Sequence, residues 1–228
     1  MASVEQQPVI RGEIDLLRNY PKTKRDLESR NSNKTDEVRK IARLFGEEYF
    51  DGDRQFGYGG FNYNPKYWDQ VVRDIFQHYR LSQESRILDI GCAKGFMLYD
   101  FKKNYPSIQV SGIDVSEYAI ANSMPEVKQY LSLGNATDLP YGDKSFDLVI
   151  SINTLHNLDK NDCGKALQEI SRVTRKYAFI TVDAYTNPEE YERIMKWNLT
   201  AKTILSTQEW KDFFVKYNYT FDYFWFTP

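Results

Sequence analysis

The decapeptide RILDIGCAKG, at residues 86–95, predicts a buried strand that runs through a turn of small residues into a helix. A second apolar strand, IQVSGID, ends at Asp114, about twenty residues further along the chain. In a βαβ unit, such a turn lets a ligand approach the backbone, and the helix start offers free N–H groups. An acid at the end of the second strand accepts hydrogen bonds from ribose hydroxyls. These two segments therefore predict a nucleotide-binding unit.

Apolar runs and helical patterns alternate along the rest of the chain. Strands are predicted at 86–90, 109–113, 146–151 and 177–183, with a weaker one at 129–133, and helices at 96–104, 116–122 and 162–174. Right-handed crossovers then place helices on both faces of a mostly parallel sheet. The sequence predicts a doubly wound, Rossmann-like α/β fold with six or seven strands.

The C-terminal segment predicts a further helix and strand. Ser206 and Glu209 form a capping-box pattern ahead of a helix. The run YTFDYFWF at 219–226 has the composition of a strand, and LTAKTIL at 199–205 can supply one more. The count of edge strands stays open for this reason.

Two further segments, GNATDLPY at 134–141 and KSFDLVIS at 144–151, complete an ordered set. With the decapeptide and Asp114 they resemble the class I S-adenosylmethionine-dependent methyltransferases, and the resemblance covers roughly residues 65–228. One glycine-rich turn is found in many proteins, whereas four segments in the right order are hard to obtain by chance. The resemblance implies S-adenosylmethionine as cofactor, S-adenosylhomocysteine as product and no metal. It also implies that the sheet ends in an antiparallel pair of strands.

The resemblance assigns a cofactor site. Asp89 is expected to face the cofactor's amino group and Asp114 both ribose hydroxyls. Asn135 stands where the family commonly has an acid, and its carbonyl oxygen can accept from the adenine amino group. Ala93 replaces the commoner glycine, and alanine fits there only if its φ is negative. The residues expected to bind the cofactor are Asp89, Gly91, Cys92, Ala93, Gly95, Asp114, Val115, Asn135, Ala136, Ile152 and Asn153.

Each of these assignments has a structural alternative. The small residues at 91–95 can form an ordinary tight turn, and Asp114 can cap the helix that follows it. Residues 134–141 can be a surface turn. Ligand binding is preferred because all the segments occur together.

Methyl transfer from a sulfonium to an oxygen or nitrogen is an in-line displacement that needs an aligned, desolvated nucleophile. A general base is needed only if the acceptor is protonated. His156 is the candidate base because imidazole titrates near neutral pH, and the alternative is that it packs its loop. Tyr58 and Asp183 are further catalytic candidates. Arg54, which can pair with the cofactor carboxylate or with an anionic acceptor, and Tyr185 are expected to bind substrate.

Residues 1–34 carry many charges and few apolar side chains, so the sequence predicts a flexible arm. A helix is predicted from Asp36, capped by Thr35 or by Asp36 itself and ending at Gly46. A second helix is predicted to begin at Pro65, because proline suits the first turn.

The chain divides into two parts on this interpretation. Residues 1–64 form an arm, a helix and a loop, and residues 65–228 form the catalytic domain. The loop DGDRQFGYGGF at 51–61 is expected to close over the cofactor as a lid, with glycines as the hinge. The alternative is an aromatic plug that covers the sheet.

Composition limits the partners. Lysine and arginine number 30 against 32 acids, and no long basic run is present, so no nucleic-acid partner is expected. The N-terminus lacks a secretory pattern and no stretch has membrane-spanning length, so a cytoplasmic protein without a membrane partner is expected. Cys92 and Cys163 are expected to be reduced thiols. A small-molecule acceptor is expected, a sugar or a secondary metabolite by family analogy, and a homodimer stays open.

Two other functions compete with this interpretation. One is an NAD-dependent Rossmann oxidoreductase, against which Phe96 at the third fingerprint position and the segment 134–141 both argue. The other is a non-catalytic S-adenosylmethionine-binding partner subunit, since cofactor residues can persist after acceptor chemistry is lost. The sequence alone leaves the second alternative open.

Overall fold

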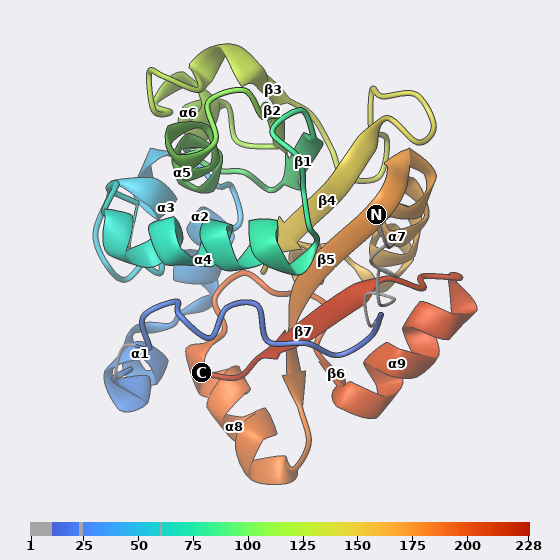
Figure 1. The fold of residues 1–228 in the computed structure, drawn as a ribbon. Helices are drawn as coiled ribbons and strands as arrows, with labels where there is room; N and C mark the ends of the chain where they lie inside the picture. Colours follow the sequence, from blue (N-terminus) through green and yellow to red (C-terminus); the bar gives the residue numbers. More distant parts are fainter. Residues whose placement is uncertain (1–10, 23–24, 60) are drawn as a thin grey trace, which may run out of the picture.

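The computed structural model describes residues 11–22, 25–59 and 61–228. In this part of the chain a seven-stranded sheet has the order β3-β2-β1-β4-β5-β6, and β7 also pairs with β5 (Figure 1). The strands are β1 Arg86–Ile90, β2 Gln109–Asp114, β3 Leu131–Leu133, β4 Phe146–Ile152, β5 Thr174–Tyr185, β6 Leu205–Ser206 and β7 Asp222–Phe226. Their pairings are parallel. The predicted doubly wound α/β fold is confirmed.

Helices cover both faces of the sheet (Figure 1). They are α1 Leu27–Asn33, α2 Asp36–Ala42, α3 Glu47–Phe50, α4 Pro65–His78, α5 Phe96–Asn104, α6 Glu117–Ala121, α7 Lys160–Val173, α8 Pro188–Trp197 and α9 Thr207–Lys216, with 3₁₀ turns η1 Lys128–Tyr130 and η2 Leu155–Asn157. On one face α4 and α5 bury Val71 and Phe101. On the other face α7 and α9 bury Leu167 and Trp210. Within the described ranges, none of the helices combines the length and the apolar character needed to cross a bilayer.

Three helix starts form where the sequence predicts them. The Thr35 hydroxyl accepts a hydrogen bond from the third residue of α2, as an N-cap does. Helix α4 begins at Pro65, whose missing N–H costs nothing in the first turn. Ser206 and Glu209 form the predicted capping box of α9.

The helix end predicted at Gly46 is wrong by one turn. Helix α2 ends at Ala42, and the chain reverses at Phe45, which has a φ of 50°. The Phe45 N–H donates to the Ala42 carbonyl at 3.1 Å, which satisfies a free carbonyl at the helix end. Gly46 instead precedes α3, which forms one helical turn ahead of the predicted loop at 51–61.

The last strand runs in the direction opposite to the one that the resemblance implies. Strand β7 pairs in parallel with Phe179–Asp183 of β5, and β6 pairs in parallel with the two residues that follow. Helix α9 lies between β6 and β7 in the chain, so it acts as a crossover that returns the chain in the same direction. Of the run 199–205, only Leu205 enters a strand.

The prediction that residues 1–34 form a flexible arm is wrong for the residues described, while residues 1–10 and 23–24 lie outside the described part. Glu13 forms a parallel bridge with Tyr223 of β7. The Ile14 N–H donates to the Tyr223 carbonyl, and the Tyr223 N–H donates to the Gly12 carbonyl, both at 2.9 Å. In Figure 1 this blue segment runs beside β7. Composition gave no sign of it because the partner lies at the far end of the chain.

Side chains also fix this N-terminal segment. The Gly12 N–H donates to the Asp222 carboxylate at 2.7 Å, and the Tyr79 hydroxyl donates to the other oxygen of that carboxylate at 2.9 Å. Leu16 is only 4% exposed and belongs to the core between the sheet and α4. The segment is therefore part of the folded unit.

Replacement of Leu16 by Ala tests this packing. The variant is expected to lose about 2–5 kcal/mol of unfolding free energy, because a buried leucine side chain is removed and leaves a cavity. Leu44→Ala is the matched control, since Leu44 is 73% exposed, and it should change stability by less than about 0.5 kcal/mol. Urea denaturation measures both. Equal, small losses in the two variants would contradict an ordered N-terminal segment.

Candidate functional site

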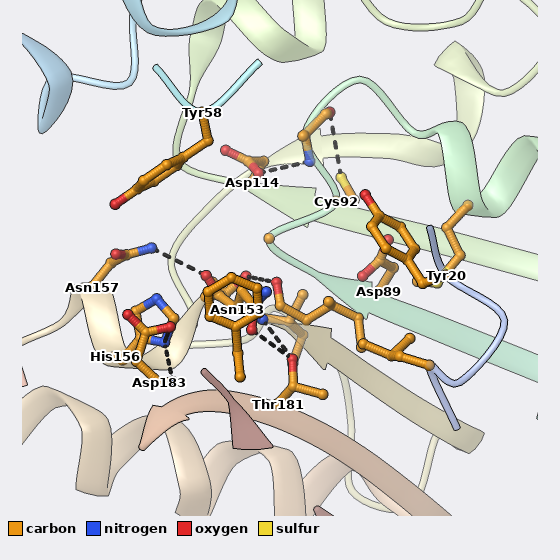
Figure 2. Close-up of a pocket in the computed structure, with 18 of the residues that line it drawn as sticks. Tyr20, Tyr58, Asp89, Cys92, Asp114, Asn153, His156, Asn157, Thr181 and Asp183 are labelled. Carbon is orange, nitrogen blue, oxygen red and sulfur yellow. Dashed lines mark hydrogen bonds and ion pairs between the residues drawn. The ribbon is translucent and has the colours of Figure 1, made fainter. Parts of the chain in front are cut away.

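A cavity of about 950 Å³ opens at the carboxyl ends of β1, β2, β4 and β5. Doubly wound folds bind ligands at this edge. Residues of 45–50, residues of the predicted lid at 54–59 and 61, the end of β7, residues of the N-terminal segment 15–22, and Arg25 contribute further walls. All the predicted site residues line the cavity except Gly95 and Tyr185. Figure 2 shows how side chains from these segments converge.

The turn after β1 requires glycine at two positions. Gly91 has a φ of 80°, and a Cβ there would lie 2.1 Å from the Thr154 hydroxyl oxygen. Gly95 has a φ of 78°, and its Cβ would lie 2.9 Å from a methyl of Leu131. Gly91 therefore lets the chain after β4 approach the cavity floor. Gly95 serves the packing of α5 and does not reach the cavity.

The backbone of Ala93 does not have the negative φ that the sequence analysis required of it. Its φ is 48°, in the left-handed region, whereas a negative φ was expected. An L-residue with a Cβ pays about 1–2 kcal/mol for this conformation. The Ala93 N–H donates to the Asp114 carboxylate at 2.8 Å, and this charge-assisted bond opposes the strain.

Asp114 ends β2 with both oxygens engaged by backbone. One oxygen accepts from the Ala93 N–H and the other from the Ser116 N–H at 2.9 Å. Burial raises the pKa of Asp114, and these hydrogen bonds lower it. Ser116, not Asp114, caps α6, which removes the alternative role for this acid. Beside Asp114, the side chain of Val115 is 52% exposed. It offers an apolar surface on which a nucleobase ring could lie.

Two predicted adenine contacts lie on the next turn. The Asn135 carbonyl oxygen accepts from the Thr137 N–H at 3.0 Å, so one of its lone pairs is used locally. The second lone pair is available. Ala136 is buried at the cavity wall. The contact of Asn135 with adenine stays a prediction.

The chain after β4 is held from β5. Asn153 has a φ of 52°, and its N–H donates to the Thr181 hydroxyl at 3.0 Å. The Thr181 hydroxyl donates in return to the Asn153 side-chain oxygen at 2.8 Å. Ile152 and Asn153 are thereby fixed at the cavity floor, as Figure 2 shows for Asn153.

His156 has a geometry that contradicts the predicted role of general base. Its Nδ1 accepts a hydrogen bond from the Asp183 N–H at 2.9 Å (Figure 2). The neutral ring therefore carries its proton on Nε2, and Nε2 can only donate. Burial lowers the pKa of His156, although the Asp183 carboxylate raises it. The sequence could not indicate this, because the partner is a backbone group of another strand.

Asp183 places a carboxyl group beside this ring. It is 5% exposed, and one of its oxygens lies 3.6 Å from His156 Nδ1. Burial raises the pKa of Asp183, while His156 and Arg25 lower it. The Trp210 indole N–H donates to the Asp183 carbonyl at 2.9 Å and fixes the backbone. A carboxyl with a raised pKa at a cavity wall can exchange a proton with a ligand.

Tyr58 is engaged by the protein rather than directed at a reacting atom. Its hydroxyl oxygen accepts from the N–H groups of Leu199 and Thr200, at 2.7 and 3.2 Å. The ring packs beside Trp197 of α8. These contacts position the segment after α8, and they do not support a catalytic role for Tyr58.

Of the two predicted substrate-binding residues, one lines the cavity and the other does not. Arg54 lines the cavity from the lid. Tyr185 does not, because β5 extends past the cavity, and the Tyr185 hydroxyl donates to Glu209 at 3.5 Å. The assignment of Tyr185 to substrate binding is therefore wrong.

Sequence reasoning missed the contacts that hold the lid. Lys94, in the turn after β1, forms an ion pair with Asp51 at 2.6 Å, and the Tyr118 hydroxyl donates to the same carboxylate at 2.7 Å. Burial raises the pKa of Asp51, but these partners lower it overall. The Ser116 hydroxyl donates to the Phe45 carbonyl at 2.5 Å. The one feature of the sequence that could have indicated these contacts is Lys94, a charged residue within a turn of small residues.

Metal ligation has no candidate among residues 11–22, 25–59 and 61–228, where three or more His, Cys, Asp or Glu side chains nowhere form a suitable group. Cys92 faces the cavity, and burial raises the pKa of its thiol well above the ordinary value. It is therefore a neutral wall residue.

Known proteins resemble this chain over the same region. Residues 88–182 match the family model described as a methyltransferase domain. The O-methyltransferase cnsE of Penicillium expansum is 32% identical over 115 residues, which cover 47% of this chain and 40% of that protein. The tRNA (carboxymethyluridine(34)-5-O)-methyltransferase of Arabidopsis thaliana is 31% identical over 133 residues, covering 57% of this chain and 31% of that protein. The chain thus spans less than half the length of either relative.

A solved structure shares the fold. The SAM-dependent methyltransferase of Methanosarcina mazei superposes with a TM-score of 0.51 at 20% identity, over 63% of this chain and 82% of its own. The region that matches the family model contains the glycine turn after β1 and Asp114, the acid that ends β2. On this evidence residues 88–182 match a methyltransferase domain, and the fold around them is shared with a solved SAM-dependent methyltransferase.

Proposed function

We propose that the protein transfers a methyl group from S-adenosylmethionine to an oxygen or nitrogen of a small molecule. The observation that carries this proposal is one cavity in which Asp89 and Asp114 flank the left-handed turn at Gly91. A cationic cofactor with a ribose matches that set of groups. The O-methyltransferase similarity supports the reaction class.

Asp89 provides the test of fit. Its side chain is 5% exposed and faces the cavity, and among the residues that the structure describes none donates a hydrogen bond to it. Burial and then repulsion from Asp114 raise its pKa to about 8. A buried carboxyl without a partner is unfavourable unless a ligand supplies a donor or a positive charge. The cofactor's ammonium group would meet this need, so the residues fit S-adenosylmethionine.

Each part of the site would hold a different part of the cofactor. Asp114 has further lone pairs for the ribose hydroxyls, and Val115 offers its side chain to adenine. Gly91 lines the cavity where the methionine part would lie. The lid contact between Lys94 and Asp51 would keep water away from the reacting atoms.

The chemistry at the acceptor would be proton removal. The bound sulfonium supplies an activated methyl group, so no metal is required. Asp183 is our candidate for the group that takes the acceptor proton, because its raised pKa makes it a better base than an ordinary aspartate. His156 Nε2 would donate a hydrogen bond that orients the acceptor.

Asp114→Asn tests the ribose contact. The variant removes the charge but keeps the size, and the dissociation constant of S-adenosylhomocysteine should rise about 10–100-fold, as for the loss of charged hydrogen bonds. Asp138→Asn on an exposed loop is the control and should bind like the unchanged protein. Isothermal titration calorimetry gives both constants, with circular dichroism to check folding. Unaltered affinity in Asp114→Asn would remove the basis of the proposal.

Asp89→Asn tests the unpaired carboxyl through stability. Asp89 has a pKa of about 8 in the folded protein, against about 3.9 in an unfolded chain. Between these values the folded state holds a proton that the unfolded state releases, so the contribution of Asp89 to stability without cofactor is greatest below about pH 4. It should fall with rising pH until about pH 8, by at most about 1.4 kcal/mol per pH unit.

The Asn variant stays neutral and lacks this loss. Urea denaturation at about pH 5 and about pH 9 should therefore show a smaller pH dependence in Asp89→Asn than in the unchanged protein. The gap between them should be larger at the higher pH. Parallel behaviour of the two proteins would show that Asp89 is not protonated in the folded state.

Activity is tested with tritium-labelled S-adenosylmethionine and two acceptor pools, a small-molecule extract and total RNA. Label is expected in the small molecules. In Asp183→Asn the rate should fall about 10²–10⁴-fold and lose its decline at acidic pH, because the ionised carboxylate is the active form. His156→Gln should keep that decline.

Three outcomes would count against parts of the proposal. Label in RNA would exclude a small-molecule acceptor, and cofactor binding without label in either pool would favour a non-catalytic partner subunit. A pH profile that changes only in His156→Gln would restore histidine as the base.

A further inference from the structure

The cavity has a second charged cluster, distinct from the acids at the cofactor turn. Arg25, Arg54 and Arg193 line it from three different segments: the residues before α1, the lid and α8. We call these three side chains the arginine rim. Arg25 is half-buried, and the other two are exposed at the opening.

Arg25 is the most constrained member of the rim. Its guanidinium carbon lies 5.2 Å from the centre of the Trp197 ring and 4.7 Å from that of Phe226. Burial lowers the pKa of Arg25, and the positive charges of Arg193 and Arg54 lower it further, while Asp183 raises it. Arg25 is therefore the member of the rim that feels the charge of the other two.

The rim has few partners within the protein. In the described part of the chain, none of its guanidinium groups forms an ion pair with an aspartate or glutamate side chain. Arg193 donates to the Pro228 carbonyl. The nearby Arg30 shows the contrast, because its guanidinium donates to the Gln55 and Gly57 carbonyls and so serves the lid. Gathered cations without counter-charges are unfavourable unless an anion joins them.

The rim belongs to the acceptor end of the cavity. Arg25 lies over the ring of Phe226, which pairs in the sheet with Asp183, the candidate base, whereas Asp89 and Asp114 lie at the ends of β1 and β2. The two charged clusters thus lie near different reaction partners. Trp197 and Phe226, the two rings that Arg25 contacts, also line the cavity.

We propose that the arginine rim binds an anionic group, a carboxylate or a phosphate, on a flat acceptor whose body lies against Trp197 and Phe226. This rests on the proposed function, since it names the class of molecule that receives the methyl group. Guanidinium groups match both anions with paired hydrogen bonds. Aromatic rings favour a planar body over a flexible chain. The anionic end would leave the nucleophile directed at Asp183.

The test uses defined probes on the protein saturated with S-adenosylhomocysteine. Calorimetry compares 4-hydroxybenzoate and 4-hydroxyphenyl phosphate with the neutral isostere 4-hydroxybenzamide. At least one anionic probe is expected to bind about ten times more tightly than the amide or better, as charged hydrogen bonds do. The stronger of the two anions identifies the source, carboxylate or phosphate.

Two variants locate the effect. Arg25→Met keeps an apolar stem against Trp197 but removes the charge, and it should abolish the preference for the anion. Arg73→Met is the control, because Arg73 lies on α4 outside the cavity and pairs with Asp69 at the surface. It should retain the preference, and both variants should bind S-adenosylhomocysteine as the unchanged protein does.

The outcomes separate this proposal from the function on which it rests. Equal affinity for the amide and both anions, or no binding of any probe to the loaded protein, would overturn the anionic acceptor while leaving methyl transfer intact. Weaker S-adenosylhomocysteine binding in Arg25→Met would also overturn it, since the rim would then serve the cofactor carboxylate. Failure of the unchanged protein to bind S-adenosylhomocysteine at all would instead defeat the proposed function.

Discussion

Much of the site depends on the carboxylate of Asp114, which accepts hydrogen bonds from two backbone N–H groups at the carboxyl ends of β1 and β2. It accepts from Ala93 in the turn after β1 and from Ser116 at the start of α6. Ser116 in turn holds the lid through the Phe45 carbonyl. One buried charge therefore fixes the conformation of the turn, the capping residue of the next helix and the position of the lid. Loss of its geometry would spread to all three.

The cavity carries opposite charges at its two ends. In the proposed cofactor region Asp89 and Asp114 supply carboxyl groups, and a bound cation would favour the ionised form of Asp89, whose pKa is otherwise raised to about 8. The arginine rim makes the other end basic. In a space of about 950 Å³ this separation would draw two ligands of opposite charge to different positions before any specific contact forms. Asp183 lines the same cavity, beside the buried ring of His156.

The parts of the fold that could be predicted are those that depend on local sequence. Strand and helix positions follow from periodicity, and the glycine turn and Asp114 follow from the chemistry of a βα unit. The errors concern contacts between distant residues. His156 accepts from a backbone group 27 residues away, and Gly12 donates to a carboxylate 210 residues away. No local pattern encodes either contact. The positive φ of Ala93 is likewise imposed by Asp114 on another strand.

The pairing of residues 12–14 with β7 has a consequence for solubility. A strand at the border of a sheet exposes unpaired N–H and C=O groups that can recruit a second molecule into an intermolecular ladder. Here that border is covered by a very short stretch of chain, and Glu13 within it forms an ion pair with Lys211 at 3.1 Å. Short, charged borders discourage further β addition. Residues 12–14, which pair with β7, would thus also disfavour aggregation through this edge of the sheet.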